Sequence, residues 1–209
     1  IINIAVVGLG QVGIYLLNEL NTKKKDIELK TGKKINVVAV SAKNIKKERQ
    51  FKVDNKIFFK NPLEIFNKKK VDILFEAIGL ADGISKKVVE TALKKKIHVI
   101  TPNKALISKH GNYLAKIAEL NNVNLEFEAS VAGGIPILRT IKEGLATNKI
   151  SKVYGILNGT TNYILSEMEN SNQSFKDVLK KAQKLGYAEP GNSKFDLNGF
   201  DAFAKVRIL

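Results

Sequence analysis

The N-terminal segment constrains the fold of this chain more than any other part of the sequence. Residues Ile2–Val7 form a short apolar run rich in β-branched side chains, which is typical of a buried parallel strand. The run passes into a glycine-rich pattern, Gly8-Leu9-Gly10-Gln11-Val12-Gly13. The chain after it is amphipathic, with apolar residues at helical spacing at Val12, Leu16, Leu17 and Leu20. A strand, a glycine loop and a helix are therefore predicted in immediate succession.

In such a unit each glycine has its own structural task. Gly8 allows the tight turn, Gly10 lets the backbone approach a pyrophosphate, and Gly13 lets the helix pack closely on the strand. The pyrophosphate lies at the helix N-terminus, where free N–H groups and the helix dipole favour an anion. A chance glycine turn is the alternative. The flanking strand and helix instead favour dinucleotide binding, with contacts at Gly8, Gly10, Gln11, Val12 and Gly13.

The end of the second predicted strand, Ile35–Val40, bears on the choice of dinucleotide. NAD-selective sites usually place Asp or Glu here, to accept a hydrogen bond from the ribose 2′-hydroxyl. This chain reads Ser41-Ala42-Lys43 instead, and a hydroxyl with a lysine suits a 2′-phosphate better than a bare ribose. We therefore favour NADP, with Lys43 as the contact, and keep NAD as the alternative. The competing interpretation is that Lys43 belongs to a solvated, lysine-rich surface.

The composition excludes several kinds of chemistry. With 209 residues, 44% of them hydrophobic, the chain can bury the core of one domain or somewhat more. It contains no cysteine, which excludes disulfides and thiolate catalysis, and its histidines, His98 and His110, have no partner at metal-ligand spacing. The sequence has no signal-peptide pattern and no apolar run of about 18 residues or more. We therefore expect a cytoplasmic protein with no membrane partner.

The net charge of +15 at pH 7 invites a nucleic-acid interpretation, which the pattern of the charges does not favour. Almost all of the positive residues are lysines, in clusters dispersed over predicted loops and helix ends. Nucleic-acid recognition relies on arginine forks and stacking aromatic side chains, and no basic stretch here is interleaved with aromatics. We expect no dedicated nucleic-acid partner.

Predicted strands and helices alternate through the first part of the chain, which indicates a parallel sheet. The predicted fold class is α/β, with a Rossmann-type, doubly wound parallel sheet followed by a second domain. The small-residue loop Ala129–Pro136 marks the boundary, so we expect a dinucleotide-binding domain over residues 1–129 and a second domain over residues 130–209. Further strands are expected at 57–59, 71–77, 98–100 and 124–127, and helices at 62–67, 84–95 and 106–121.

Ligands of such sheets bind at the carboxyl ends of the strands, so the residues that follow each strand are candidates for the site. Gly79 follows the strand at 71–77 and could admit the nicotinamide end of a cofactor, while Lys104 follows the strand at 98–100. A lysine at a helix N-terminus opposes the helix dipole. This conflict favours a functional role for Lys104 over that of an ordinary surface lysine.

The second domain begins with a polar loop. A strand is expected at 153–157, followed by Asn158-Gly159-Thr160-Thr161-Asn162. The hydroxyl and amide groups of this loop could bind a substrate or a cofactor amide, and we select Thr160 as the candidate substrate contact. Thr161 or Asn162 would equally serve as the N-cap of the next helix, and both interpretations can hold.

The C-terminal end carries carboxylates and a lysine within a short span. Glu189 and Asp196 precede Asp201 and Lys205, and the last two are at i,i+4 spacing, which puts them on one face of a helix. Carboxylates can hold the ammonium or hydroxyl group of an amino acid, and a partly buried lysine can move a proton. The cluster therefore predicts a substrate site.

Five blocks of the sequence follow the order found in the homoserine dehydrogenase family. They are the glycine loop, Thr-Pro-Asn-Lys-Ala-Leu from 101, Glu-Ala-Ser-Val-Ala-Gly-Gly-Ile-Pro from 128, Asn-Gly-Thr-Thr-Asn from 158, and Gly-Tyr-Ala-Glu-Pro from 186 with Asp-Leu-Asn-Gly-Phe-Asp-Ala from 196 and Lys205. The chain resembles the N-terminal two-thirds of a homoserine dehydrogenase, and the blocks span essentially all of it.

The resemblance implies interconversion of L-homoserine and L-aspartate 4-semialdehyde with a nicotinamide cofactor, on the route to threonine, methionine and isoleucine. It also implies residue roles. Lys205 corresponds to the family's acid/base lysine, Lys104 to a second active-site lysine, and Asp201 to the acid beside the substrate carboxylates. Glu189 and Asp196 correspond to the carboxylates that bind homoserine.

The resemblance further implies a structural sodium ion and a homodimer of the full-length protein. The ion would be held near the domain hinge by Glu128, Val131, Gly133 and Ile135, mostly through backbone carbonyls. The chain has no initial methionine and ends within a predicted helix, so we expect a fragment whose α/β substrate and dimerisation domain is incomplete. The segment Gly191–Lys194 is also one residue longer than the family pattern.

Two alternatives to this enzyme remain at this stage. The first is another NAD(P)-dependent reductase of the aspartate pathway, which the combination of Glu189, Asp201 and Lys205 disfavours. The second is a cofactor-binding regulatory module without catalysis. That alternative predicts nucleotide binding without any dependence on homoserine.

Overall fold

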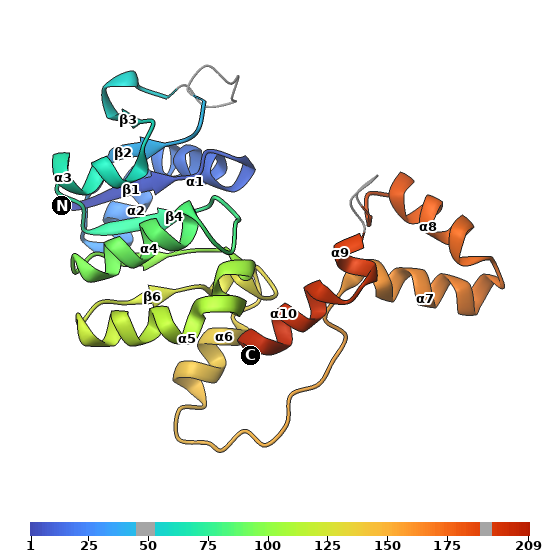
Figure 1. The fold of residues 1–209 in the computed structure, drawn as a ribbon. Helices are drawn as coiled ribbons and strands as arrows, with labels where there is room; N and C mark the ends of the chain where they lie inside the picture. The colour runs from blue at the N-terminus through green and yellow to red at the C-terminus, as the bar shows by residue number, and fades with distance from the viewer. Residues whose placement is uncertain (45–52, 189–193) are drawn as a thin grey trace. The chain divides into compact units, whose positions relative to one another are not determined.

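A computed structural model describes residues 1–44, 53–188 and 194–209 of the chain, and it divides into two compact units, Ile1–Ile135 and Pro136–Leu209 (Figure 1). The first unit contains strands β1 (Ile2–Val7), β2 (Ile35–Ser41), β3 (Phe58–Phe59), β4 (Ile73–Glu76), β5 (His98–Ile100) and β6 (Leu125–Glu126). Its helices are α1 (Gln11–Thr22), α2 (Lys24–Thr31), α3 (Ile65–Lys68), α4 (Ile84–Lys94) and α5 (Lys104–Leu120), with short 3₁₀ turns η1 (Asn55–Ile57), η2 (Pro62–Glu64) and η3 (Glu128–Ser130).

The six strands form one parallel sheet in the order β3-β2-β1-β4-β5-β6. From β1 the chain builds outward in one direction to β3, then returns to β4 and builds in the other direction to β6. This reversal confirms the predicted doubly wound fold, and it lies between β1 and β4, where Val7 is in register with Glu76. In open α/β sheets, ligands bind at this switch point, at the carboxyl ends of the strands.

The core of the first unit lies on both faces of the sheet. Ile4 and Val6 of β1 pack with Leu17 of α1 in one apolar cluster. The right-handed crossover rule places α4 and α5 on the opposite face, because the chain moves from β4 to β6 in the opposite direction. Four apolar residues of α4 are fully buried, at Val88, Val89, Ala92 and Leu93.

The apolar pattern of α1 is only partly as predicted. Leu17 is buried, and Leu16 and Leu20 pack partly buried against the same cluster, but the side chain of Val12 is 52% exposed. The helix begins at Gln11, so Gly13 and Leu17, four residues apart, are the buried positions on this helix. Val12 is one residue out of phase with that face.

The second unit is helical in the part that the structure describes. It contains α6 (Ile137–Arg139), the π-helical turn η4 (Thr140–Gly144), α7 (Gly159–Ser171), α8 (Phe175–Lys184), α9 (Lys194–Leu197) and α10 (Phe200–Ile208). A small core forms around Ile164, Val178, Ala182 and Ala188. No helix among the described residues of either unit is long and apolar enough to cross a membrane.

The strand predicted at 153–157 is wrong. These residues have no regular structure, and Tyr154 and Ile156 are 84% and 78% exposed. A strand exists only when a neighbouring strand takes up its backbone hydrogen bonds, and the described residues after Pro136 contain no strand. The β-branched and aromatic residues of the segment favour a strand, but no neighbouring strand is present among the described residues of this unit to pair with it.

Candidate active site

The glycine loop fits a bound pyrophosphate. Gly8 has a φ of +97°, and a Cβ built on it would lie 2.4 Å from the carbonyl carbon of Ala77, so only glycine is accommodated. A Cβ on Gly13 would lie 2.0 Å from the carbonyl oxygen of Gly8, which is the close helix–strand approach that the sequence predicts. A Cβ on Gly10 would meet nothing within 4 Å, so the backbone beside the helix start is open to a ligand.

Helix α1 directs its N-terminus at this loop. Gly10 is its N-cap and has no side chain to occupy the first free N–H groups. Gln11 and Val12 form the first turn and are exposed. These backbone N–H groups and the helix dipole together form an anion site of the kind that binds dinucleotide phosphates.

The other predicted cofactor residues lie at the same edge of the sheet. Lys43 is exposed and comes two residues after β2 ends at Ser41. Gly79 comes three residues after β4, has a φ of +88°, and would place a Cβ in open space. These positions suit a cofactor lying across the carboxyl ends of the strands. The individual contacts stay predictions.

Lys104 is the first residue of α5 and is half-buried. The preceding residue, Asn103, is the N-cap of α5, and its side-chain oxygen accepts a hydrogen bond from the backbone N–H of Leu106 at 3.1 Å. The turn that carries Lys104 is therefore fixed by a helix cap, and the lysine emerges at the carboxyl end of β5.

Sequence reasoning missed a buried carboxylate at this edge. Glu76, the last residue of β4, is 0% exposed. Its Oε1 accepts a hydrogen bond from the backbone N–H of Ile78 at 2.8 Å, and its Oε2 accepts one from the Thr101 hydroxyl at 2.7 Å. The side-chain amide of Asn103 lies 3.3 Å from Oε2. The available signal was a charged residue at the end of an otherwise apolar strand.

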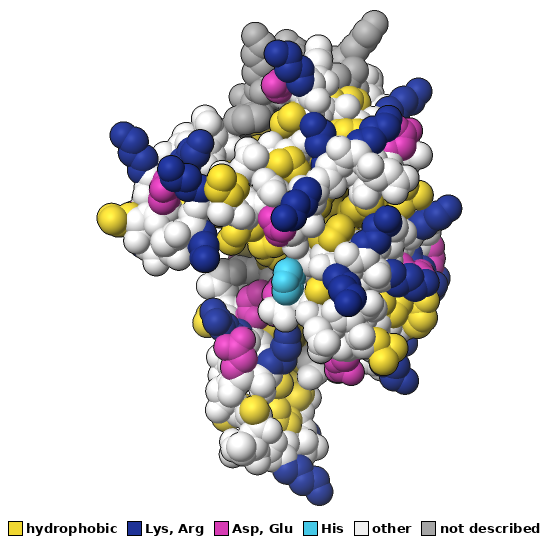
Figure 2. Space-filling model, turned by 90° about the vertical axis from the view of Figure 1, so that its left-hand side faces the viewer, with side chains coloured by type: hydrophobic (Ala, Val, Ile, Leu, Met, Phe, Trp, Pro, Cys, Tyr) yellow, Lys and Arg dark blue, Asp and Glu magenta, His cyan; other side chains and the backbone are white. Residues whose placement is uncertain are grey.

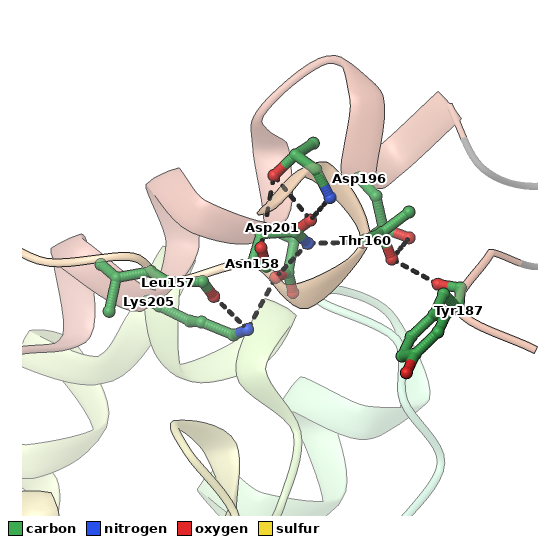
Figure 3. Close-up of polar contacts among 8 residues, drawn as sticks. Leu157, Asn158, Thr160, Tyr187, Asp196, Asp201 and Lys205 are labelled. Atoms are coloured by element: carbon green, nitrogen blue, oxygen red, sulfur yellow. Dashed lines mark hydrogen bonds and ion pairs between the residues drawn. The ribbon is translucent and has the colours of Figure 1, made fainter. Parts of the chain in front are cut away.

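In the second unit, Asn158 organises the polar cluster shown in Figure 3. It is the N-cap of α7, where its Oδ1 accepts hydrogen bonds from the backbone N–H of Thr161 at 2.8 Å and from the Thr161 hydroxyl at 2.9 Å. The prediction that Thr161 or Asn162 caps this helix is therefore wrong. The helix begins at Gly159, one residue after the cap, so those residues lie within its first turns.

The side-chain amide nitrogen of Asn158 also joins two carboxylates. It lies 2.9 Å from Oδ1 of Asp196 and 2.9 Å from Oδ2 of Asp201. Asn158 and Asp201 are 7% and 5% exposed. A buried carboxylate needs charge-assisted hydrogen bonds to offset its lost hydration, and the amide supplies one to each acid.

Lys205 completes this cluster from the same helix as Asp201. Its Nζ lies 2.7 Å from Oδ2 of Asp201 and donates to the backbone carbonyl of Leu157 at 2.6 Å. The side chain of Lys205 is 21% exposed and that of Asp201 8%. The predicted placement of these residues on one helical face is confirmed by this contact (Figure 3), and the Lys205 side chain stays partly accessible.

Thr160 lies beside the cluster with its hydroxyl engaged inside the protein. The hydroxyl donates to the backbone carbonyl of Tyr187 at 2.5 Å and lies 3.5 Å from Oδ2 of Asp196. The Tyr187 ring stacks on Tyr163 with ring centroids 4.6 Å apart, which holds that segment against α7. Thr160 is 8% exposed. Glu189, the other predicted substrate carboxylate, lies outside the described residues.

The predicted sodium residues Glu128, Val131, Gly133 and Ile135 follow one another in the turn after β6. The carbonyl oxygen of Glu128 accepts a hydrogen bond from the backbone N–H of Val131 at 3.4 Å, and Ala132 has a φ of +49°. Backbone carbonyls are suitable ligands for a hard cation. No group of three or more His, Cys, Asp or Glu side chains at metal-binding distance occurs in the described ranges.

Positive charge is spread over the surface. On the face shown in Figure 2, the Lys and Arg side chains are scattered and do not gather into a single patch. The two histidines have ordinary partners: His110 lies 2.8 Å from Oδ1 of Asp82, and His98 accepts a hydrogen bond from the backbone N–H of Asn124 at 3.1 Å.

The sheet topology and the glycine loop define the first unit as a nicotinamide dinucleotide-binding domain of the Rossmann type. Comparison with known families agrees. Residues 8–128 match the family model "Homoserine dehydrogenase, NAD binding domain", and residues 136–209 match the model "Homoserine dehydrogenase". The chain belongs to the homoserine dehydrogenase family.

Individual relatives support this assignment. The chain is 41% identical over 208 residues to the homoserine dehydrogenase of Neisseria gonorrhoeae, covering 100% of this chain and 47% of that protein. The crystal structure of a homoserine dehydrogenase from Thiobacillus denitrificans superposes with a TM-score of 0.86 at 38% identity, covering 98% of this chain and 47% of that one.

A hyperthermophilic archaeal homoserine dehydrogenase in complex with NADPH shares the fold with a TM-score of 0.80 at 24% identity, covering 99% of this chain and 68% of that one. The chain spans about half the length of the curated relatives it matches, from 46% to 48%, rather than the two-thirds inferred from the sequence blocks.

Proposed function

We propose that the full-length protein interconverts L-homoserine and L-aspartate 4-semialdehyde with NADP as cofactor, in the biosynthesis of threonine, methionine and isoleucine. The observation that carries the proposal is the hydrogen-bonded group of Asn158, Asp196, Asp201 and Lys205, in which Asn158 and Asp201 are buried, in a chain whose first unit is built to bind a dinucleotide. A lysine held by a carboxylate and surrounded by further acids suits an amino-alcohol substrate.

Lys205 is the proton-transfer group. In the oxidation direction the O–H bond of homoserine breaks and its proton passes to the neutral amine of Lys205, which becomes the ammonium group, as the carbinol carbon loses hydride and forms the aldehyde C=O. The nicotinamide, when bound, supplies the hydride acceptor. Asp201 and the Leu157 carbonyl use two of the three donors of the Lys205 ammonium group and fix its direction. In the reduction direction Lys205 returns the proton to the aldehyde oxygen.

Asp196 and Glu189 hold the α-ammonium group of the substrate. Asn158 keeps the carboxylate of Asp196 oriented through the hydrogen bond at 2.9 Å. The sequence predicts Thr160 as a direct substrate contact, but its hydroxyl donates to the Tyr187 carbonyl, so we assign it to holding the segment at Tyr187 beside α7. Lys104 is assigned as the second active-site lysine.

The remaining assignments concern the cofactor, the metal and the assembly. Lys43 accounts for a preference for NADP, because its exposed ammonium group suits a 2′-phosphate and the chain has Ser41 where NAD sites place an acid. The turn containing Glu128 and Val131 would hold a sodium ion through its carbonyl oxygens. We also propose a cytoplasmic homodimer for the full-length protein.

The test is homoserine-dependent reduction of NADP, and of NAD for comparison, by full-length wild type, Lys205→Ala and Lys180→Ala. Lys180 is an exposed lysine of α8 and provides the matched control. We expect Lys205→Ala to lose about a hundredfold or more in kcat with unchanged NADP affinity, since it removes the proton-transfer group. NADP binding by wild type without homoserine turnover would favour a regulatory module, and full activity in Lys205→Ala would refute the role of the lysine.

A further inference from the structure

We infer that Glu76 is a positioning residue for the cofactor and for Lys104, an assignment that rests on the proposed function. Its carboxylate sits at the switch point of the sheet, where the reversal of strand order brings the ligand loops together. It joins the loop after β4 to the turn after β5 through hydrogen bonds accepted by the two oxygens of one carboxylate.

Each oxygen of Glu76 fixes a different loop. Oε1 accepts from the backbone N–H of Ile78 at 2.8 Å, at the start of the loop that carries Gly79. Oε2 accepts from the hydroxyl of Thr101 at 2.7 Å, and the Asn103 side-chain amide lies 3.3 Å away. That same amide donates to the backbone carbonyl of Leu80 at 2.9 Å, which closes the connection between the two loops.

The connection continues to Lys104. The Thr101 hydroxyl accepts a hydrogen bond from the backbone N–H of Asn103 at 3.0 Å, and Asn103 caps α5, whose first residue is Lys104. The position of this lysine is therefore determined through Thr101 and Asn103 by the carboxylate of Glu76. A shift of about 1 Å in such a group can lower the rate about a hundredfold.

Glu76 also adjoins the glycine loop. It is in register with Val7, and the next residue, Ala77, donates its backbone N–H to the Val7 carbonyl at 2.7 Å. A Cβ on Gly8 would lie 2.4 Å from the carbonyl carbon of Ala77, so the glycine loop rests directly on the backbone that follows Glu76. Displacement of this backbone would move the pyrophosphate site.

Stability alone does not account for a carboxylate here. Glu76 is fully buried, and its described partners are a backbone N–H, a hydroxyl and an amide. Burying such a group costs several kcal/mol of hydration, about what its hydrogen bonds return, whereas an apolar residue at the end of a buried strand carries no such cost. Through its two oxygens the carboxylate accepts hydrogen bonds from both loops at once.

The variants that test this assignment preserve shape. Glu76→Gln keeps the size of the side chain but replaces one acceptor oxygen by an NH2 group. That group cannot accept from the Ile78 N–H on one side or, on the other, from the Thr101 hydroxyl and the Asn103 amide. Thr101→Val removes only the hydroxyl, and Thr101→Ser retains it and is the matched control. All are made in the full-length protein and compared for thermal unfolding, NADP dissociation constant, kcat and KM for homoserine, and amide hydrogen exchange of residues 78–80 and 101–106.

We expect Glu76→Gln and Thr101→Val to remain folded, to exchange faster in both segments, and to lose tenfold to about a hundredfold in kcat/KM, with weaker NADP binding. Thr101→Ser, which retains the hydroxyl, should keep the wild-type exchange rates, kcat/KM and NADP affinity. Lower thermal stability with unchanged kcat, KM and NADP affinity would overturn the assignment. If Glu76→Gln does not fold, the comparison of Thr101→Val with Thr101→Ser tests the assignment of Glu76. Absence of homoserine turnover in wild type would reject the proposed function instead, and the NADP affinity and exchange data would still test Glu76.

Discussion

The substitution Asn158→Asp tests the polar cluster with the smallest change of shape. An aspartate keeps the oxygen that caps α7 but removes the amide donors to Asp196 and Asp201, each at 2.9 Å. A hydrogen bond to a charged group contributes about 1.5–3 kcal/mol, so the loss of both amounts to about 3–6 kcal/mol. The new carboxylate also faces two existing ones, and a repulsion of about 4 kcal/mol at 4 Å is partly offset by Lys205.

The matched control is Asn162→Asp, an identical change four residues along the same helix. Asn162 is exposed, and its substitution should alter stability by less than about 0.5 kcal/mol. We expect Asn158→Asp to lower the free energy of unfolding of the full-length protein by about 3 kcal/mol or more. Its kcat/KM for homoserine should fall about a hundredfold, because the two acids are no longer held in place and a misplacement of about 1 Å can cost that much in rate.

Urea unfolding and steady-state kinetics on the two variants measure these effects. If Asn158→Asp matches Asn162→Asp in both stability and kcat/KM, the amide does not organise the acids and the description of the cluster is incorrect.

Two other predictions concern the first unit. Gly13→Ala should abolish tight NADP binding and destabilise the fold, because its Cβ would lie 2.0 Å from a carbonyl oxygen of the glycine loop. Gly10→Ala has open space around its Cβ, so it should keep wild-type stability and lose only cofactor affinity. Isothermal titration and thermal unfolding distinguish the two variants. Hydrogen bonds from Lys94 and Tyr113 hold the pKa of Glu90 below its ordinary value of 4.5. A lowered carboxyl pKa stabilises the fold above the ordinary pKa, and this contribution is lost as the pH falls through the folded-state pKa. Glu90→Gln should therefore lower the free energy of unfolding by about 0.5–1 kcal/mol at pH 7 and by progressively less below about pH 4. Urea unfolding of wild type and variant at pH 7 and below about pH 4 measures this difference, and an equal loss at the two pH values would contradict the prediction.

Local patterns were sufficient to predict much of the first unit. The positive φ at Gly8 and the approach of Gly13 to the Gly8 carbonyl both arise within one short segment, so the glycine spacing predicted them. The helical spacing of Asp201 and Lys205 likewise predicted their contact at 2.7 Å. In each case the chain geometry of one element decides which atoms meet.

Contacts between distant segments could not be predicted in this way. Asn158 reaches Asp196 and Asp201 across 38 and 43 residues, and Thr101 reaches Glu76 across 25. Neither spacing nor composition encodes these pairings, because they depend on how loops fold back at the ends of elements. The strand predicted at 153–157 was wrong for a related reason, since a segment with strand propensity forms a strand only beside another strand.

The most direct test of the proposed activity follows the hydride. Full-length protein is incubated with NADP and with homoserine that carries deuterium on the carbinol carbon, and the reduced cofactor is examined by mass spectrometry and proton NMR. We predict that deuterium appears at the nicotinamide C4 position of NADPH and that aspartate semialdehyde accumulates. Bound but unreduced NADP, or reduced cofactor without deuterium, would contradict it.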